Sequence, residues 1–328
     1  MSHHDTPLTE ASNPSSCGLD VMPTHRLLQL INDDYRCMYD VVAQALPDIS
    51  RAVDLIVERL ACGGSLVFVG AGTSGRLGVV EAAECLPTFG VGPDVVSALI
   101  AGGSDAVFSP AEGAEDNENG GSQDIGARVD SESVVVGVSA SGSTPYVRGA
   151  LNGARSIGAA TIAIVCNHAR YVTLDADALI AIPVGPEVLT GSTRMKAGSA
   201  QKLVLNMLST ASMARLGRIY DNLMIDMQPT NRKLQERATR MLCALSGSSR
   251  AQSEAILLTC DWNVKTALVM AMTGVCRTHA EDAIARCGGH ARKAIEMAGV
   301  MNRLSSDCHW QPAEPTTGRI APWTNQEL

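Results

Sequence analysis

The chain has 328 residues, enough for one large domain with a smaller companion or for two ordinary domains. Its composition, 45% hydrophobic and 18% charged, is that of a globular protein. A net charge of −8, an aromatic content of 3% and the lack of a long apolar run argue against a nucleic-acid partner and against a membrane span.

Residues 1–24 are polar and irregular in pattern, which predicts an N-terminal arm without the apolar segment of a signal peptide. The ten cysteines include no CxxC pair, so their spacing gives no support for zinc binding or redox chemistry. Reduced, mostly buried thiols are the simplest interpretation. We therefore expect a cytoplasmic protein without a metal site.

Apolar residues at helical spacing predict helix over residues 25–60. Short apolar runs with helix-compatible stretches between most of them then predict five strands, at residues 65–70, 95–100, 133–138, 161–165 and 179–183. Strands that alternate with helices predict an α/β fold of three layers, a doubly wound parallel sheet with helices on both faces.

A long helix is predicted from about Thr193, capped by Ser192 or Thr193. Beyond Met241 there is no strand signal, and helical patterns occupy residues 243–258, 264–274, 278–286 and 290–301. The sequence therefore predicts an α/β domain over residues 25–240, a small helical domain over 241–301 and a tail over 302–328.

A glycine-rich loop, Gly-Ala-Gly-Thr-Ser-Gly-Arg at residues 70–76, follows the first strand and precedes a helix. It satisfies GxGxxG, but a dinucleotide site needs an acidic residue at the end of the second strand, and this strand ends Ile100-Ala-Gly-Gly. Small hydroxyls beside the free N–H groups of a helix start suit a terminal phosphate instead. The candidate phosphate ligands here are Gly72, Thr73 and Ser74.

A second hydroxyl-rich loop follows the third strand and leads into a helix that is predicted to begin near Pro145. One such loop by itself is usually a helix cap. Two of them at the carboxyl ends of neighbouring parallel strands, with a third Gly-Ser-Thr cluster at residues 191–193, favour a binding site for a small phosphorylated molecule. The further candidates are Ser139, Ser141, Gly142, Ser143, Thr144 and Ser192.

Long segments of the chain resemble the N-acetylmuramic acid 6-phosphate etherases: GAGTSGRLGVVEAAECLPTFG, EGAEDN, the stretch at residues 185–217, YDNLMIDMQPTN and VKTALVMAMTGV. The resemblance runs from about Thr9 to about Ile295. It implies one sugar-isomerase (SIS) domain, a three-helix UBA-like domain, a homodimer and no cofactor. The chain departs from the family where Ser12 and Ser143 replace arginines and where Leu86 replaces a proline.

The activity that the resemblance implies is cleavage of the lactyl ether of N-acetylmuramic acid 6-phosphate, which gives N-acetylglucosamine 6-phosphate and D-lactate during cell-wall recycling. A base removes the C2 proton of the opened sugar, lactate leaves C3, and water adds there. Glu84 and Glu115 match the two catalytic positions. The apolar neighbours of Glu84 favour a protonated acid, and the acidic loop around Glu115 favours a base. Glu187 is a candidate for a sugar hydroxyl or for a structural role.

Two other functions use the same loops. A non-catalytic sugar-phosphate sensor would resemble glucokinase regulatory protein, and an aldose–ketose isomerase would share the deprotonation at C2. The presence of both glutamates argues against the sensor, and release of lactate would separate the lyase from both.

Overall fold

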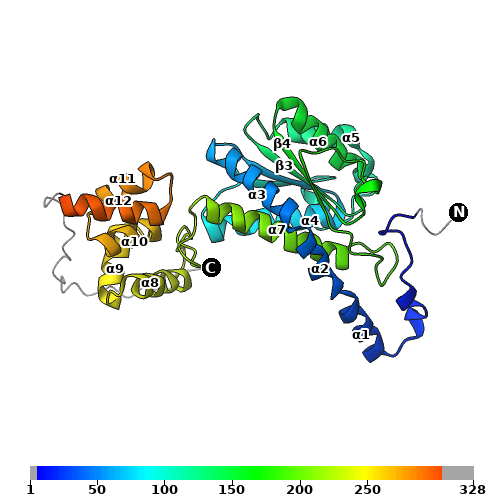
Figure 1. Ribbon diagram of the computed structural model, residues 1–328, viewed down its shortest axis with the longest axis horizontal. Helices are drawn as coiled ribbons and strands as arrows, with labels where there is room; N and C mark the ends of the chain where they lie inside the picture. The colour runs from blue at the N-terminus through cyan, green and yellow to red at the C-terminus, as the bar shows by residue number, and fades with distance from the viewer. Residues whose placement is uncertain (1–5, 305–328) are drawn as a thin grey trace, which may run out of the picture. The chain divides into compact units, whose positions relative to one another are not determined.

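The computed structural model describes residues 6–304, and its contacts divide the chain into a first unit that ends at Ile219 and a second that begins at Tyr220 (Figure 1). This division lies ahead of the boundary predicted at residue 240. The reason is that α8 (Arg232–Ser246) contributes Ala238 and Leu242 to the core of the second unit.

The first unit contains a five-stranded parallel sheet in the order β2-β1-β3-β4-β5. All five predicted strands are present: β1 (Leu66–Gly70), β2 (Val96–Ile100), β3 (Val134–Ser139), β4 (Ala160–Val165) and β5 (Ala178–Ala181). The prediction of a doubly wound α/β fold is therefore confirmed.

Helices cover both faces of the sheet (Figure 1). One face packs on α3 (Leu46–Ala61), α4 (Gly72–Phe89) and α7 (Lys196–Arg215), and the other on α5 (Glu118–Gly126) and α6 (Pro145–Ile157). Successive strand residues point to opposite faces, so Phe68 enters the first core and Val69 the second. Because both faces are buried, the strands have the continuous apolar sequences from which they were predicted.

The predicted helical stretch over residues 25–60 consists of three helices, α1 (Thr24–Asp34), α2 (Cys37–Gln44) and α3. Pro47 lies in the first turn of α3, where its missing N–H is tolerated, and a continuous helix could not pass through it. The arm before α1 includes two short 3₁₀ helices, η1 (Pro14–Ser16) and η2 (Leu19–Val21). Three more, η3 (Ser104–Val107), η4 (Ala114–Asp116) and η5 (Ala169–Tyr171), lie in loops at the carboxyl edge of the sheet.

Helices α5 and α6 approach each other closely at two glycines. A Cβ on Gly149 would lie 1.8 Å from the carbonyl oxygen of Glu118, and one on Gly121 would lie 2.0 Å from that of Tyr146. Arg148 adds a two-pronged ion pair to Glu118, with N–O distances of 3.0 and 2.6 Å. This contact fixes the start of α5 against the helix that follows β3.

The second unit is helical where the structure describes it. Its helices are α8, α9 (Arg250–Thr259), α10 (Val264–Thr273), α11 (Arg277–Arg286) and α12 (Ala291–Leu304), two more than the three-helix domain implied by the resemblance. The buried Nζ of Lys265 donates to Asp226 Oδ2, at 2.7 Å, in the segment before α8. It also donates to the carbonyl oxygen of Gly289, at 2.8 Å, in the turn before α12. The predicted tail lies outside the described residues from Ser305 on.

The glycine contact gives a test of how α5 is held on α6. Gly149→Ala is expected to destabilise the protein by about 1–3 kcal/mol, because the new methyl group would overlap a backbone carbonyl. Gly126→Ala is the matched control, since a Cβ there meets nothing within 4 Å and a helix gains slightly from the exchange. Urea unfolding of the two variants measures the difference, and equal midpoints would contradict this account of the packing.

Candidate functional site

The strand order reverses beside β1, which lies between β2 and β3. The chain leaves β1 toward β2 and later adds β3 on the other side, so the loops after β1 and β3 diverge over the carboxyl edge of the sheet. Gly70 is paired in register with Val138, so the two predicted phosphate loops begin next to each other. Open α/β sheets bind their ligands at such a position.

The first loop leaves the N-terminus of α4 uncapped. Ala71 occupies the N-cap position and no side chain accepts a hydrogen bond from the first turn, so the N–H groups of Gly72, Thr73 and Ser74 have no partner within the helix. The helix starts directly against the strand end, because a Cβ on Gly75 would lie 2.7 Å from Gly70 O. Free N–H groups and the positive end of the helix dipole together suit an anion.

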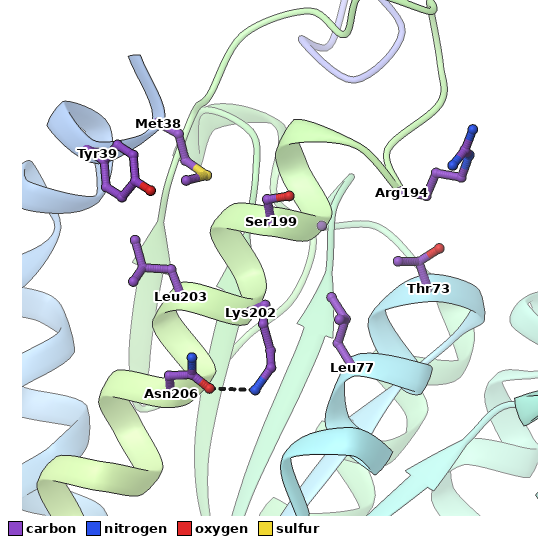
Figure 2. Close-up of a pocket in the computed structure, with 10 residues that line it drawn as sticks. Met38, Tyr39, Thr73, Leu77, Arg194, Ser199, Lys202, Leu203 and Asn206 are labelled. Carbon is purple, nitrogen blue, oxygen red and sulfur yellow. Dashed lines mark hydrogen bonds between the residues drawn. The ribbon is translucent and has the colours of Figure 1, made fainter. Parts of the chain in front are cut away.

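The two hydroxyls of this loop point in different directions. Ser74 is only 8% exposed and turns toward α7, where its Oγ donates to Gln201 Oε1 at 3.0 Å. Thr73 lines an open cavity of about 450 Å³ beside Arg194 and Lys202 (Figure 2). Thr73 is therefore the hydroxyl that is open to solvent, whereas Ser74 is engaged inside the protein.

The second loop brings its predicted hydroxyls together. Ser139 Oγ lies 2.7 Å from Thr144 Oγ1 and accepts from Gly142 N at 3.1 Å, while Ser143 Oγ donates to Ser141 Oγ at 3.0 Å. Helix α6 begins at Pro145, and the N-cap residue Thr144 makes no side-chain cap. A cluster of hydroxyls thus lies at a second uncapped helix N-terminus.

The N-terminal arm reaches this second loop, which the sequence did not indicate. Leu8 N donates to Asn167 Oδ1 at 3.1 Å, and Asn167 Nδ2 donates to Ser141 O at 3.4 Å. Asn167 is fully buried and follows β4 closely, so its place at the carboxyl edge of a predicted strand was the available signal. The predicted irregular arm is therefore anchored at the site by Asn167.

Helix α7 starts three residues later than predicted, and neither Ser192 nor Thr193 caps it. Glu187 does so instead: its carboxylate accepts from Lys196 N at 3.0 Å and from Ala197 N at 2.8 Å. Burial raises the pKa of Glu187, and these two N–H groups act against that shift. Sequence periodicity could not find this cap because Glu187 is separated from the helix by an irregular loop.

The cap changes the role expected of Glu187. The side chain is 1% exposed and both of its oxygens are used by the backbone, so it is not placed to bind a sugar hydroxyl. Ser192 remains half-buried in the loop between Glu187 and α7. Helix α7 thus has its N-terminus neutralised by the protein, while the N-termini of α4 and α6 carry no side-chain cap.

Glu115 lies at a second cavity, of about 340 Å³, beside the first loop. Its lining includes Glu112 and Glu115 from the loop after β2, and Gly72 and Arg76 from α4. Arg76 donates to Val107 O at 2.9 Å and Ser109 O at 3.4 Å. It forms no ion pair within residues 6–304. Arg76 was not singled out from the sequence, although it is the last residue of the glycine-rich loop.

Glu84 is not at this cavity. It lies twelve residues beyond Gly72 in α4 and therefore about 18 Å farther along the helix, toward the amino edge of the sheet. Its side chain is exposed, so the apolar surroundings expected for a proton donor are absent in the single chain. The buried glutamate of α4 is Glu81, 5% exposed, whose carboxylate accepts from Lys202 and Ser209 of α7.

Comparison with known proteins gives the family. A protein of Mesorhizobium japonicum named N-acetylmuramic acid 6-phosphate etherase is 48% identical over 298 residues, which cover 90% of this chain and 96% of that protein. A protein of the same name from Photorhabdus laumondii is 46% identical and covers 88% of this chain and 96% of its own length. This chain belongs to the N-acetylmuramic acid 6-phosphate etherase family.

Domain models agree with that membership. A model of the SIS domain matches residues 115–211, and one of the N-terminal SIS domain of glucokinase regulatory protein matches residues 48–155. A phosphoheptose isomerase structure from Francisella tularensis is 16% identical, covers 57% of this chain and 98% of its own, and has a TM-score of 0.44.

The described part of this etherase-family chain lacks two features. Within residues 6–304, no helix combines the length and apolar character that a membrane crossing requires. In the same range, no three His, Cys, Asp or Glu side chains gather as metal ligands would.

The helix cap gives a stability test. Glu187→Ala is expected to destabilise the protein by about 2–3 kcal/mol, because two buried N–H groups lose a charged acceptor. Glu187→Gln should cost less, since one amide oxygen still accepts. Ser192→Ala is the control, and urea unfolding compares all three. A larger loss for Ser192→Ala than for Glu187→Ala would assign the cap to the residue first predicted from the sequence.

Proposed function

We propose that this chain is a lyase that cleaves the D-lactyl ether of N-acetylmuramic acid 6-phosphate to N-acetylglucosamine 6-phosphate and D-lactate. Its close relatives carry the name of that activity. The observation that supports it best is the pair of uncapped helix N-termini beside the cavity that holds Glu115. The helix N-termini would bind the phosphate and Glu115 would act on the sugar carbon, so one substrate can use both only if they lie next to each other.

The phosphate is assigned to the N-termini of α4 and α6. Backbone N–H groups of the first loop and the hydroxyl cluster of the second would donate to its oxygens, which accept only. Ser143 is part of that cluster, so donors of the loop itself occupy the region where the family pattern has an arginine. Dipoles and hydroxyls can hold a dianion in a protein whose net charge is −8 because the field that matters is local.

Glu115 is proposed as the base that removes the C2 proton. It lies in η4 at the same cavity as Gly72, so a sugar with its phosphate on the first loop would extend toward it. Arg76 lines this cavity and is suited to the lactyl carboxylate, the second anionic group of the substrate. The elimination and the addition of water require proton transfers only, and we propose no cofactor.

Glu84 is proposed as the proton donor to the leaving lactate, from a second copy of the chain. A general acid has to be within about 3 Å of the atom that it protonates. In one subunit the length of α4 keeps Glu84 far from the cavity of Glu115. A homodimer removes this difficulty if the partner subunit presents its own Glu84 to the cavity.

The exposed face of α4 is suited to such pairing. Arg76, Val80 and Glu84 are spaced four residues apart and so lie along one face, and Val80 in its middle is 47% exposed. Two copies packed antiparallel about a two-fold axis at Val80 would place Arg76 opposite Glu84 of the partner subunit. Phe108, 91% exposed beside the carbonyl that holds Arg76, adds apolar surface to the same region.

This arrangement would complete the site twice, once in each subunit. Glu84 of the partner subunit would come level with Arg76, at the cavity that contains Glu115. Burial between the two copies would also supply the apolar surroundings that favour a protonated carboxyl. The lactyl carboxylate on Arg76 would then place the ether oxygen beside the proton donor.

We infer that the reaction serves cell-wall recycling and takes place in the cytoplasm. The substrate is a peptidoglycan amino sugar, and its phosphate and carboxylate charges prevent it from crossing a membrane unaided. An enzyme that consumes such a molecule therefore acts in the compartment where the sugar is phosphorylated or delivered.

Lactate release tests the function directly. The purified protein with N-acetylmuramic acid 6-phosphate is expected to form D-lactate, and Glu84→Ala or Glu115→Ala should lower kcat about 10²–10⁴-fold, the usual effect of losing a general acid or base. Glu58→Ala, an exposed glutamate of α3, is the control and should leave the rate unchanged. Sugar-phosphate binding without lactate would point to the sensor instead.

Mixed subunits test the shared site. When Glu84→Ala and Glu115→Ala proteins are unfolded together and refolded, half of the dimers are hybrids with one intact site, so about a quarter of the wild-type rate should return. A site contained in one subunit would give no recovery.

The interface itself is tested by charge. Val80→Lys should shift the protein toward monomer in analytical ultracentrifugation and lower lactate release. Val300→Lys, at a valine of the second unit with a similar exposed fraction of 48%, should do neither.

A further inference from the structure

Gln201 of α7 is buried behind the first phosphate loop with half of its side-chain amide unsatisfied. It is 1% exposed, and its Oε1 accepts from Ser74 Oγ at 3.0 Å. Its Nε2 has no hydrogen-bond partner of normal geometry within the described residues. The amide instead lies against the thiol of Cys166, whose sulfur is a weak acceptor. A buried donor without a proper acceptor is costly and calls for an explanation.

The side-chain amide of glutamine occupies almost the same volume after a half-turn that exchanges its oxygen and nitrogen. After that turn, Nε2 of Gln201 would donate to Ser74 Oγ across the same separation, and Oε1 would face Cys166. Burial raises the pKa of the Cys166 thiol, so the thiol keeps its proton and can donate it. At present it donates to Ala197 O, at 3.6 Å.

The two orientations differ in what Ser74 can offer to a ligand. A serine hydroxyl has one proton, and in the present orientation Gln201 takes it. Ser74 then presents only lone pairs, which repel the oxygens of a phosphate. With the amide turned, Gln201 donates to Ser74 and the serine proton is free for the ligand.

We propose that Gln201 is a positioning residue that turns its amide when a phosphate binds at the N-terminus of α4, so that Ser74 donates its hydroxyl proton to that phosphate. The proposal deepens the proposed function, on which its ligand, a sugar phosphate, rests. It also gives the orphaned Nε2 a partner in the bound state. The turn makes Ser74 a ligand although it is engaged inside the protein without one.

Gln201→Glu is the decisive variant because, at a pH high enough to ionise this buried carboxyl, the carboxylate only accepts and holds the Ser74 proton. We expect its KM to rise about tenfold, with kcat within about threefold of wild type, as for loss of one hydrogen bond to a charged ligand. At lower pH the new carboxyl is protonated and can donate, so its KM should return toward the wild-type value. Gln201→Met fills the same space without a hydrogen bond and should show a smaller, pH-independent rise.

Ser74→Ala provides the second half of the test. If Gln201 acts through Ser74, adding Gln201→Glu to Ser74→Ala should raise KM no further. Independent, multiplying effects of the two changes, or the same pH-independent KM for Gln201→Glu and Gln201→Met, would overturn the proposal. Thermal unfolding followed by circular dichroism identifies any variant whose effect comes from misfolding.

Binding of inorganic phosphate, measured by calorimetry without substrate, separates this proposal from the proposed function. A tenfold loss for Gln201→Glu that disappears at lower pH would support the role of Gln201 even if the wild-type protein released no lactate. Lactate release by the wild type, together with unchanged phosphate affinity in Gln201→Glu, would sustain the lyase and overturn the role of Gln201.

Discussion

Helices α4, α6 and α7 begin at the carboxyl edge of the sheet, and among these three only α7 receives a carboxylate acceptor from the protein. The carboxylate of Glu187 accepts from the first two N–H groups of α7, so the positive end of that helix is satisfied inside the fold. The first turns of α4 and α6 have no such acceptor. The same cap holds α7 where its residues Gln201 and Lys202 contact α4. The proposed ligand site therefore lies at the N-termini of α4 and α6, which Glu187 does not cap.

The groups gathered at this edge explain how an acidic protein can select a phosphorylated sugar. The second loop contributes hydroxyls and N–H groups and no cation, and the first loop contributes the start of α4. Such donors hold an anion only in a fixed arrangement, because each hydroxyl has a single proton. The buried side chains behind the loops therefore matter as much as the exposed hydroxyls: Asn167 donates to the backbone carbonyl of Ser141 in the second loop, and Gln201 accepts the proton of Ser74 in the first.

The positions of the two glutamates follow from the geometry of a parallel sheet. A helix that connects parallel strands runs back from the carboxyl edge to the amino edge, so the two ends of α4 cannot serve one small ligand. Glu115, in a loop at the carboxyl edge, and Glu84, near the far end of α4, are separated for this reason. A two-fold axis across α4 would reverse the direction of the partner helix and bring its far end back to the site. The exposed Val80 at the middle of α4 is consistent with that axis.

The sequence by itself determined the five strands, the three-layer α/β arrangement with a parallel sheet, and the two loops that follow β1 and β3. Those features are local: a strand buried on both faces must be apolar throughout, and a turn against a helix start requires glycine and small hydroxyls. The segments around Glu84 and Glu115 also identified the family from sequence alone. Tertiary structure decided the rest. The anchoring of the arm on Asn167 and the contact of Ser74 with Gln201 join residues far apart in the chain. The cap of α7 joins residues across an irregular loop, and the exposure of Glu84 depends on what packs against α4. No periodicity or spacing records such contacts, because they depend on how the layers pack and not on the order of neighbouring residues.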